Sequence, residues 1–104
     1  GIHAEARVAS DAVLEAPVYV GPGSEVEAGA HLGPDAVLVA DVRVAAGARM
    51  RDSVIWRGGI VGPEAEVATS LLGPGVSVGR KARIDGALLG EGTVLSDFSS
   101  TSRP

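Results

Sequence analysis

The sequence predicts an all-β protein, a single-stranded parallel β-helix of about five and a half triangular coils. Three observations predict this fold: an aliphatic residue at every sixth position, twelve of the fifteen glycines in two slots between these residues, and a regular shortening of the repeat in the second half. The chain of 104 residues has room for one domain. Its apolar residues make up 45% of the chain and its aromatic residues only 3%, which suits a narrow core of small side chains.

Two columns of apolar residues define the repeat. The first column is aliphatic and comprises Ile2, Val8, Leu14, Val20, Val26, Leu32, Leu38, Val44 and Met50. The second column stands four residues later, is small or β-branched, and comprises Ala6, Ala12, Val18, Ser24, Ala30, Ala36, Val42, Ala48 and Val54. Side chains of extended segments alternate between two faces, so we expect both columns to point into one core.

The spacing of the first column changes after Met50. Five-residue steps at 50–54, 67–71 and 84–88 begin 17 residues apart, and the column resumes after them at Ile55, Leu72 and Leu89. A recurrence of six, six and five residues indicates that three repeats make one coil, with the short step always on the same side.

Glycine, aspartate and proline occupy the expected turns. The slot after the aliphatic residue holds Gly21, Gly33, Gly62, Gly73, Gly79 and Gly90. The slot two residues further on holds Gly23, Gly29, Gly47, Gly58, Gly75 and Gly92, or else Asp11, Asp35 and Asp41, which predicts positive φ there. Prolines between these slots suit the first corner of a turn. None of the glycines precedes a helical pattern, so no phosphate-binding loop is predicted.

Composition limits the partners and the compartment. A net charge of −4 gives no electrostatic reason to expect a nucleic acid or an anionic membrane as a partner. No apolar run approaches the roughly 18 residues of a membrane span, and the N-terminus has no signal-peptide pattern. The absence of cysteine excludes thiolate sites. We therefore expect a cytoplasmic protein.

The repeat, with an aliphatic residue followed by Gly, Ala, Asp or Glu and later by Ser, Thr, Ala or Val, resembles the hexapeptide repeat of bacterial transferases over residues 2–95. The resemblance implies a left-handed coil, an exception to the usual right-handed crossover. Residues 96–104 are expected to form a polar C-terminal tail, in which Phe98 folds back over the last coil and the rest frays.

The segments Ser53–Trp56, Ser70–Gly73 and Ala87–Gly90 are more specific. They resemble coils in the C-terminal domains of sugar-1-phosphate nucleotidyltransferases, such as mannose-1-phosphate guanylyltransferases and glucose-1-phosphate thymidylyl- or uridylyltransferases. The resemblance implies a parent enzyme that joins a nucleoside triphosphate to a sugar 1-phosphate, with Mg²⁺, in an N-terminal domain outside this chain. For the chain itself it implies a non-catalytic role in oligomerisation or regulation, with no catalytic, cofactor-binding or metal-binding residue.

Two other functions are weighed. A hexapeptide acyltransferase needs a His general base, and His31 is predicted to point outward while His3 lies at a turn. No insertion interrupts residues 2–95 to wall an acyl-CoA channel, so a solvated His31 is favoured. The other alternative is a purely structural scaffold.

Zinc in the γ-carbonic anhydrase branch of the fold needs three His ligands, and the chain has two. Glu25, Glu27, Glu64 and Glu66 are expected on a solvated face.

The expected surface contains one candidate interface, because stacked coils place Trp56 above Val39 and near Ile60. Outward aromatic and aliphatic neighbours are typical of protein contacts, so we predict that Val39, Trp56 and Ile60 contact another chain in a homo-oligomer. A second apolar strip contains Tyr19 and Val37, and Arg7, Glu25 and Arg43 are expected to form an ion ladder. The repeat begins at Ile2 without a polar capping repeat before it, so a preceding domain or a partner is expected to cover the first coil.

Overall fold

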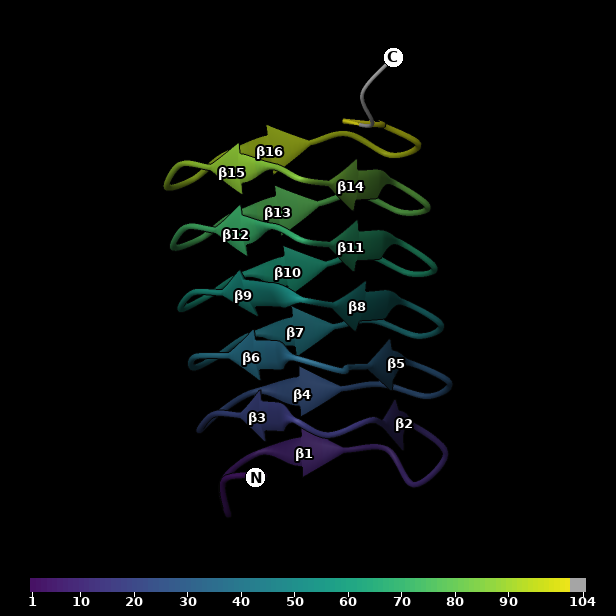
Figure 1. The fold of residues 1–104 in the computed structure, drawn as a ribbon, viewed down its shortest axis with the longest axis vertical. Helices are drawn as coiled ribbons and strands as arrows, with labels where there is room; N and C mark the ends of the chain where they lie inside the picture. Colours follow the sequence, from purple (N-terminus) through teal and green to yellow (C-terminus); the bar gives the residue numbers. More distant parts are fainter. Residues whose placement is uncertain (102–104) are drawn as a thin grey trace.

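Three parallel sheets form the three sides of a left-handed parallel β-helix in the computed structural model, which describes residues 1–101 (Figure 1). Sheet A consists of β3 (Val18–Val20), β6 (Ala36–Leu38), β9 (Ser53–Ile55), β12 (Leu71–Leu72) and β15 (Leu88–Leu89). Sheet B consists of β1 (Arg7–Val8), β4 (Glu25–Val26), β7 (Arg43–Val44), β10 (Ile60–Val61), β13 (Ser77–Val78) and β16 (Val94–Leu95). Sheet C consists of β2 (Val13–Leu14), β5 (His31–Leu32), β8 (Arg49–Arg51), β11 (Glu66–Ala68) and β14 (Arg83–Asp85).

The strand register confirms the predicted change of coil length. Tyr19 pairs with Val37, 18 residues later, whereas Val37 pairs with Val54 and Val54 pairs with Leu71 at intervals of 17 residues. The short step lies at the corner between sheets C and A, where Asp52 alone separates β8 from β9.

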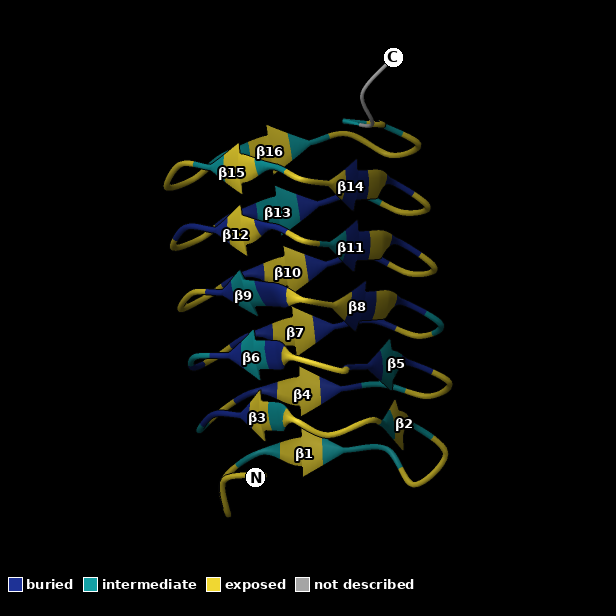
Figure 2. Cartoon of the chain, in the orientation of Figure 1, coloured by how far each residue is buried: buried dark blue, intermediate teal, exposed yellow. Residues whose placement is uncertain are grey.

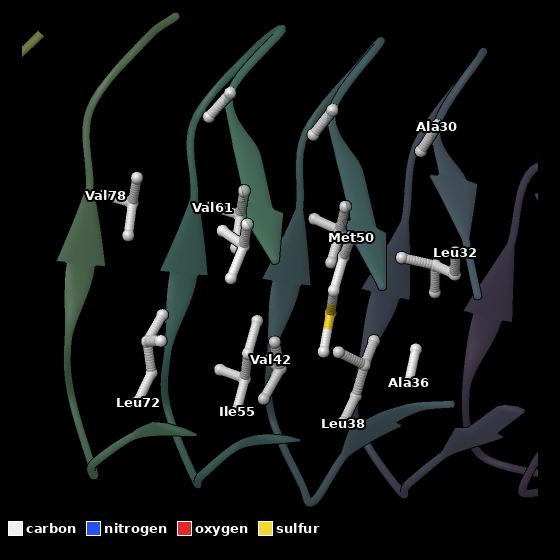
Figure 3. Close-up of a cluster of buried hydrophobic side chains, with 14 of the residues drawn as sticks. Ala30, Leu32, Ala36, Leu38, Val42, Met50, Ile55, Val61, Leu72 and Val78 are labelled. Atoms are coloured by element: carbon white, nitrogen blue, oxygen red, sulfur yellow. The ribbon is translucent and has the colours of Figure 1, made fainter. Parts of the chain in front are cut away.

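The aliphatic column forms the core, as predicted. Leu32, Leu38, Met50, Ile55 and Leu72 are each at most 2% exposed and stack along the axis of the coil (Figure 3). The small column fills the space beside them as far as Ala48. Exposure increases at both ends of the stack, where a coil has a neighbour on one side only (Figure 2).

One position of the small column was predicted wrongly. Val54 is only partly buried and points outward, whereas Ser53 is 3% exposed and takes the inward position. The short step removes a turn residue, so alternation along β9 runs backwards from the buried Ile55: Ser53 points in and Val54 points out. The same shift puts Leu71 and Leu88 on the outside of sheet A.

The turn chemistry follows the prediction with one exception. Gly23, Asp35 and Asp41 have φ of 74°, 61° and 53°, but Asp11 is not among the residues with positive φ. Gly21 serves a different purpose, because a Cβ atom there would overlap the carbonyl oxygen of Val39 in the next coil. Glycine in that slot therefore allows two coils to approach closely.

The coil continues past Leu95, where the polar tail was expected to begin. Ser100 forms a parallel bridge with Arg83, and Thr101 donates a backbone hydrogen bond to the Arg83 carbonyl. Phe98 is 64% exposed, and the Arg80 guanidinium lies 5.7 Å from its ring centroid. The fraying expected beyond Phe98 was wrong for residues 99–101, which are bonded to the preceding coil, and for residues 102–104 it lies outside the described part. Residues 1–101 contain no helix long and apolar enough to cross a membrane.

Candidate functional site

The predicted interface residues lie at and beside the corner between sheets A and B. Val39 and Trp56 follow β6 and β9 directly, and their backbones are stacked one coil apart because Leu38 pairs with Ile55. Trp56 and Ile60 are each 45% exposed, and Ile60 points outward from sheet B at the start of β10. The structure thus stacks Val39 and Trp56 and places Ile60 on the adjoining side. Their contact with another chain stays a prediction.

The outer face of sheet A carries more apolar residues than the sequence predicted. Tyr19 and Val37 were expected there, and the strand register adds Val54, Leu71 and Leu88 in the same row. Val54 was expected in the inward column, because the count ran forward from Met50 as in a full six-residue repeat. In the shortened repeat this count is out by one residue, so the outward positions of Val54, Leu71 and Leu88 were missed. Alternation counted backwards from Ile55, with the small Ser53 two residues before it, would have found them.

A groove of about 530 Å³ runs along the outer face of sheet C. His31 lies in it and its Nε2 is 2.5 Å from Oε1 of Glu15; the two side chains are 35% and 52% exposed. Arg49 and Arg51 also line the groove, and Arg49 forms no ion pair with any described residue. A carboxylate beside an imidazole can orient a general base. Here both side chains are open to water.

The corners show no structure that would enclose a substrate. Between successive strands from β1 to β16 the longest connections have four residues, for example 21–24 between β3 and β4. His3 is used locally, since its Nδ1 accepts a hydrogen bond of 3.0 Å from the Glu5 backbone N–H.

The carboxylates singled out in the sequence lie on the surface. Glu27 pairs with Arg43 at 2.7 Å, while Glu64 and Glu66 lie 3.9 Å and 3.7 Å from Lys81 and Arg83. Such exposed pairs contribute little to stability. The expected ladder of Arg7, Glu25 and Arg43 is in register, but the partner of Arg43 is Glu27.

A metal ion has no evident site in the described residues. Residues 1–101 contain no group of three or more His, Asp or Glu side chains placed to hold one.

The three-sided coil and its repeat define a hexapeptide-repeat β-helix domain of the kind found in sugar nucleotidyltransferases. More particularly, the chain belongs to the GMPPB C-terminal domain family, whose model matches residues 14–100. No curated protein matches the sequence significantly.

Similar solved structures come from acetyltransferases. One is a histidine-to-asparagine mutant of perosamine N-acetyltransferase from Caulobacter crescentus in complex with CoA and GDP-perosamine, 25% identical, with a TM-score of 0.76 over 98% of this chain and 47% of that chain. Another is the acetyltransferase domain of PglB from Neisseria gonorrhoeae FA1090 in complex with acetyl coenzyme A, 19% identical, with a TM-score of 0.58 over 95% and 52% of the two chains. The second shows the fold alone. The chain spans about half the length of either protein.

Proposed function

We propose that this chain is a non-catalytic β-helix domain of a cytoplasmic sugar nucleotidyltransferase, and that it mediates self-association and regulation of that enzyme. The match of the family model to residues 14–100 carries the proposal. In the parent reaction a nucleoside triphosphate and a sugar 1-phosphate give a nucleoside diphosphate sugar and diphosphate. An N-terminal domain outside this chain would bind Mg²⁺ and both substrates.

The self-association half of the proposal rests on the surface. Trp56 and Ile60 are large apolar side chains that are each nearly half exposed, and Val39 is stacked beside Trp56. Aromatic side chains in this setting are typical anchors of protein contacts. The net charge of −4 favours a protein over a nucleic acid or an anionic membrane as the partner.

The catalytic half is tested on the complete encoded protein. Its coding sequence should contain, before Ile2, a βαβ unit with a glycine-rich nucleotide-binding loop. The complete protein should form a nucleoside diphosphate sugar from the triphosphate and a sugar 1-phosphate with Mg²⁺, and residues 1–104 alone should catalyse no pyrophosphorolysis. Turnover by residues 1–104 alone would falsify the domain assignment.

A second candidate function has one observation in its favour. The His31–Glu15 pair lies in a groove, and the fold is shared with an acetyltransferase at 25% identity. If the chain transferred acetyl groups from acetyl-CoA to an amino sugar, His31→Ala should abolish that transfer while Glu64→Ala left it unchanged. We expect no acetyl transfer by the unsubstituted chain, because the short corners enclose no CoA channel.

A further inference from the structure

The outer face of sheet A bears an unbroken apolar row. Tyr19, Val37, Val54, Leu71 and Leu88 are in register on five successive strands, one residue per coil. Tyr19 and Leu71 are each 41% exposed and Leu88 is 78% exposed. Strands of a sheet lie about 4.8 Å apart, so the row is roughly 19 Å long. Contiguous exposed apolar surface of this kind marks an interaction site.

The other two sides of the coil are different. The corresponding outward row of sheet C contains His31, Arg49 and Glu66, and that of sheet B contains Arg43 and Ser77. Sheet A alone presents an outward row without a charged side chain in the described part of the chain. The row itself contains no charge to desolvate, whereas the corresponding rows of the other two sheets contain several.

The apolar row is continuous with the corner proposed above as a contact. Val37 and Val39 are two residues apart along one extended segment, as are Val54 and Trp56, so each pair lies toward the same side of the coil. The corner therefore extends the apolar surface of sheet A at the edge where the chain leaves the sheet, here called the outgoing edge.

The opposite edge, where the chain enters sheet A, is hollow. A depression of about 650 Å³ there is lined by Pro17, Asp35, Val37, Asp52 and Val54, among others. Thus one edge of the sheet carries the 45% exposed Trp56 and the other carries a hollow that reaches the same coil. The two features lie on one molecule and cannot meet within it.

The two edges carry opposite charges at the height of the coil that contains β9. Asp35 and Asp52 stand at the incoming edge, and Asp52 is paired with Arg51 at 2.9 Å. Arg57 stands at the outgoing edge, directly after Trp56, and forms no ion pair with any described residue. At the height of this coil, Asp52 at the incoming edge and Arg57 at the outgoing edge therefore offer opposite charges, while the outgoing edge carries Asp41 and Glu91 in other coils.

A two-fold axis parallel to the coil axis, in front of sheet A, would bring opposite edges of two copies together. Rotation about it places sheet A of one copy against sheet A of the other, each coil at the height of the same coil. It also sets the outgoing edge of each copy against the incoming edge of its partner. An antiparallel pair would instead set Arg57 against a second Arg57. The extents of the molecule, 38 × 23 × 20 Å, make one face comparable to the roughly 800 Å² per partner of a stable interface.

We propose that sheet A binds a second copy of this chain in a parallel two-fold dimer, with Trp56 of each copy in the hollow of the other and Arg57 opposite Asp52. This inference rests on the self-association part of the proposed function and names its surface.

The first test is the mass of residues 1–104 in light scattering over a range of concentrations. The unsubstituted chain should show twice the 10.4 kDa of the monomer. Leu71→Asp should raise the dissociation constant at least tenfold, because the carboxylate would face the apolar row of the partner. Val13→Asp is the matched control: Val13 is also exposed on an outward strand position, but on sheet C, and its substitution should leave the mass unchanged.

The second test works even if a carboxylate at Leu71 disturbs the fold. The chain has no cysteine, so Leu88→Cys introduces a single thiol at a very exposed position. In the parallel dimer the two thiols face each other at the same height, and a short bismaleimide should link them. In an antiparallel pair they would lie at opposite ends of the row. Val13→Cys should give no cross-linked dimer.

The outcomes separate this inference from the proposed function. A monomeric unsubstituted chain contradicts both self-association and the sheet A surface, and leaves the catalytic assignment to its own assay. An oligomer that survives Leu71→Asp but dissociates with Ile60→Asp keeps self-association and overturns the sheet A surface. Absence of a Leu88→Cys cross-link in a dimeric sample overturns the parallel arrangement.

Discussion

The hydroxyl oxygen of Ser53 accepts a hydrogen bond of 3.0 Å from the backbone N–H of Ser70 in the next coil, and the same hydroxyl donates to the Arg51 carbonyl at 2.8 Å. Ser70 repeats the arrangement: its hydroxyl accepts from the Ala87 N–H at 3.1 Å and donates to the Ala68 carbonyl at 2.8 Å. The inward serines thus carry the inter-coil hydrogen bonds through the corner where the coil is shortened.

Ser53→Ala should destabilise the coil. The substitution leaves the Ser70 backbone N–H without its acceptor in a buried place, which costs about 1–3 kcal/mol. Alanine fits sterically, since Ala87 occupies the equivalent position two coils later. Urea unfolding should show this loss, whereas Ser77→Ala, on the outer face of sheet B, should change stability by less than about 0.5 kcal/mol. Equal losses for the two variants would contradict the role of the serine hydroxyl.

Gly21→Ala and Gly90→Ala should differ although both glycines occupy the slot after an aliphatic residue. At Gly21 a Cβ atom would overlap the Val39 carbonyl oxygen, so two coils must move apart, at a cost of about 1–3 kcal/mol or more. At Gly90 a Cβ atom meets nothing within 4 Å, and alanine should be neutral or should stabilise by up to about 1 kcal/mol. Melting temperatures of the two variants decide the matter; a lower value for Gly90→Ala would contradict it.

Val44→Asp should disrupt the centre of the coil. Val44 is fully buried and pairs with Val26 and Val61 in the neighbouring coils, so a carboxylate there would be buried without a partner. The cost should exceed about 4 kcal/mol. Circular dichroism should show an early or broadened unfolding transition. Val13→Asp places the same group on an exposed position and should unfold like the original protein; similar curves for both variants would argue against the core assignment.

Much of the fold could be predicted because each short repeat by itself determines which side chains point inward and where the chain turns. The aliphatic column, the small column up to Ala48 and the change from 18- to 17-residue coils all follow from side-chain alternation and turn length. The error at Val54 had a physical origin. A five-residue spacing shows that the repeat is one residue shorter, but it does not show whether the turn or the strand has lost that residue. Only the strand alternation at Ser53, Val54 and Ile55 decides it.

Side-chain partners on the surface were less predictable. The register of Arg43 with Glu25 followed from the repeat, yet Arg43 turns toward Glu27, two residues further along the neighbouring coil. The pairing of His31 with Glu15 is of the same kind. Long exposed side chains choose among several rotamers of similar energy, so coil register determines which residues are near but not which ones bind each other.

Trp56→Ala should weaken self-association without unfolding the chain. Trp56 is 45% exposed at the corner after β9, so its removal leaves the core intact, whereas a buried interface tryptophan is commonly worth about 2 kcal/mol or more of binding, a roughly thirtyfold change in dissociation constant. Phe98→Ala is a suitable control, because Phe98 is also an exposed aromatic residue but lies at the far end of the coil. Light scattering at several concentrations should show dissociation for Trp56→Ala alone. An unchanged oligomeric mass would remove Trp56 from the contact, and with it the pairing of Trp56 with the hollow edge of sheet A.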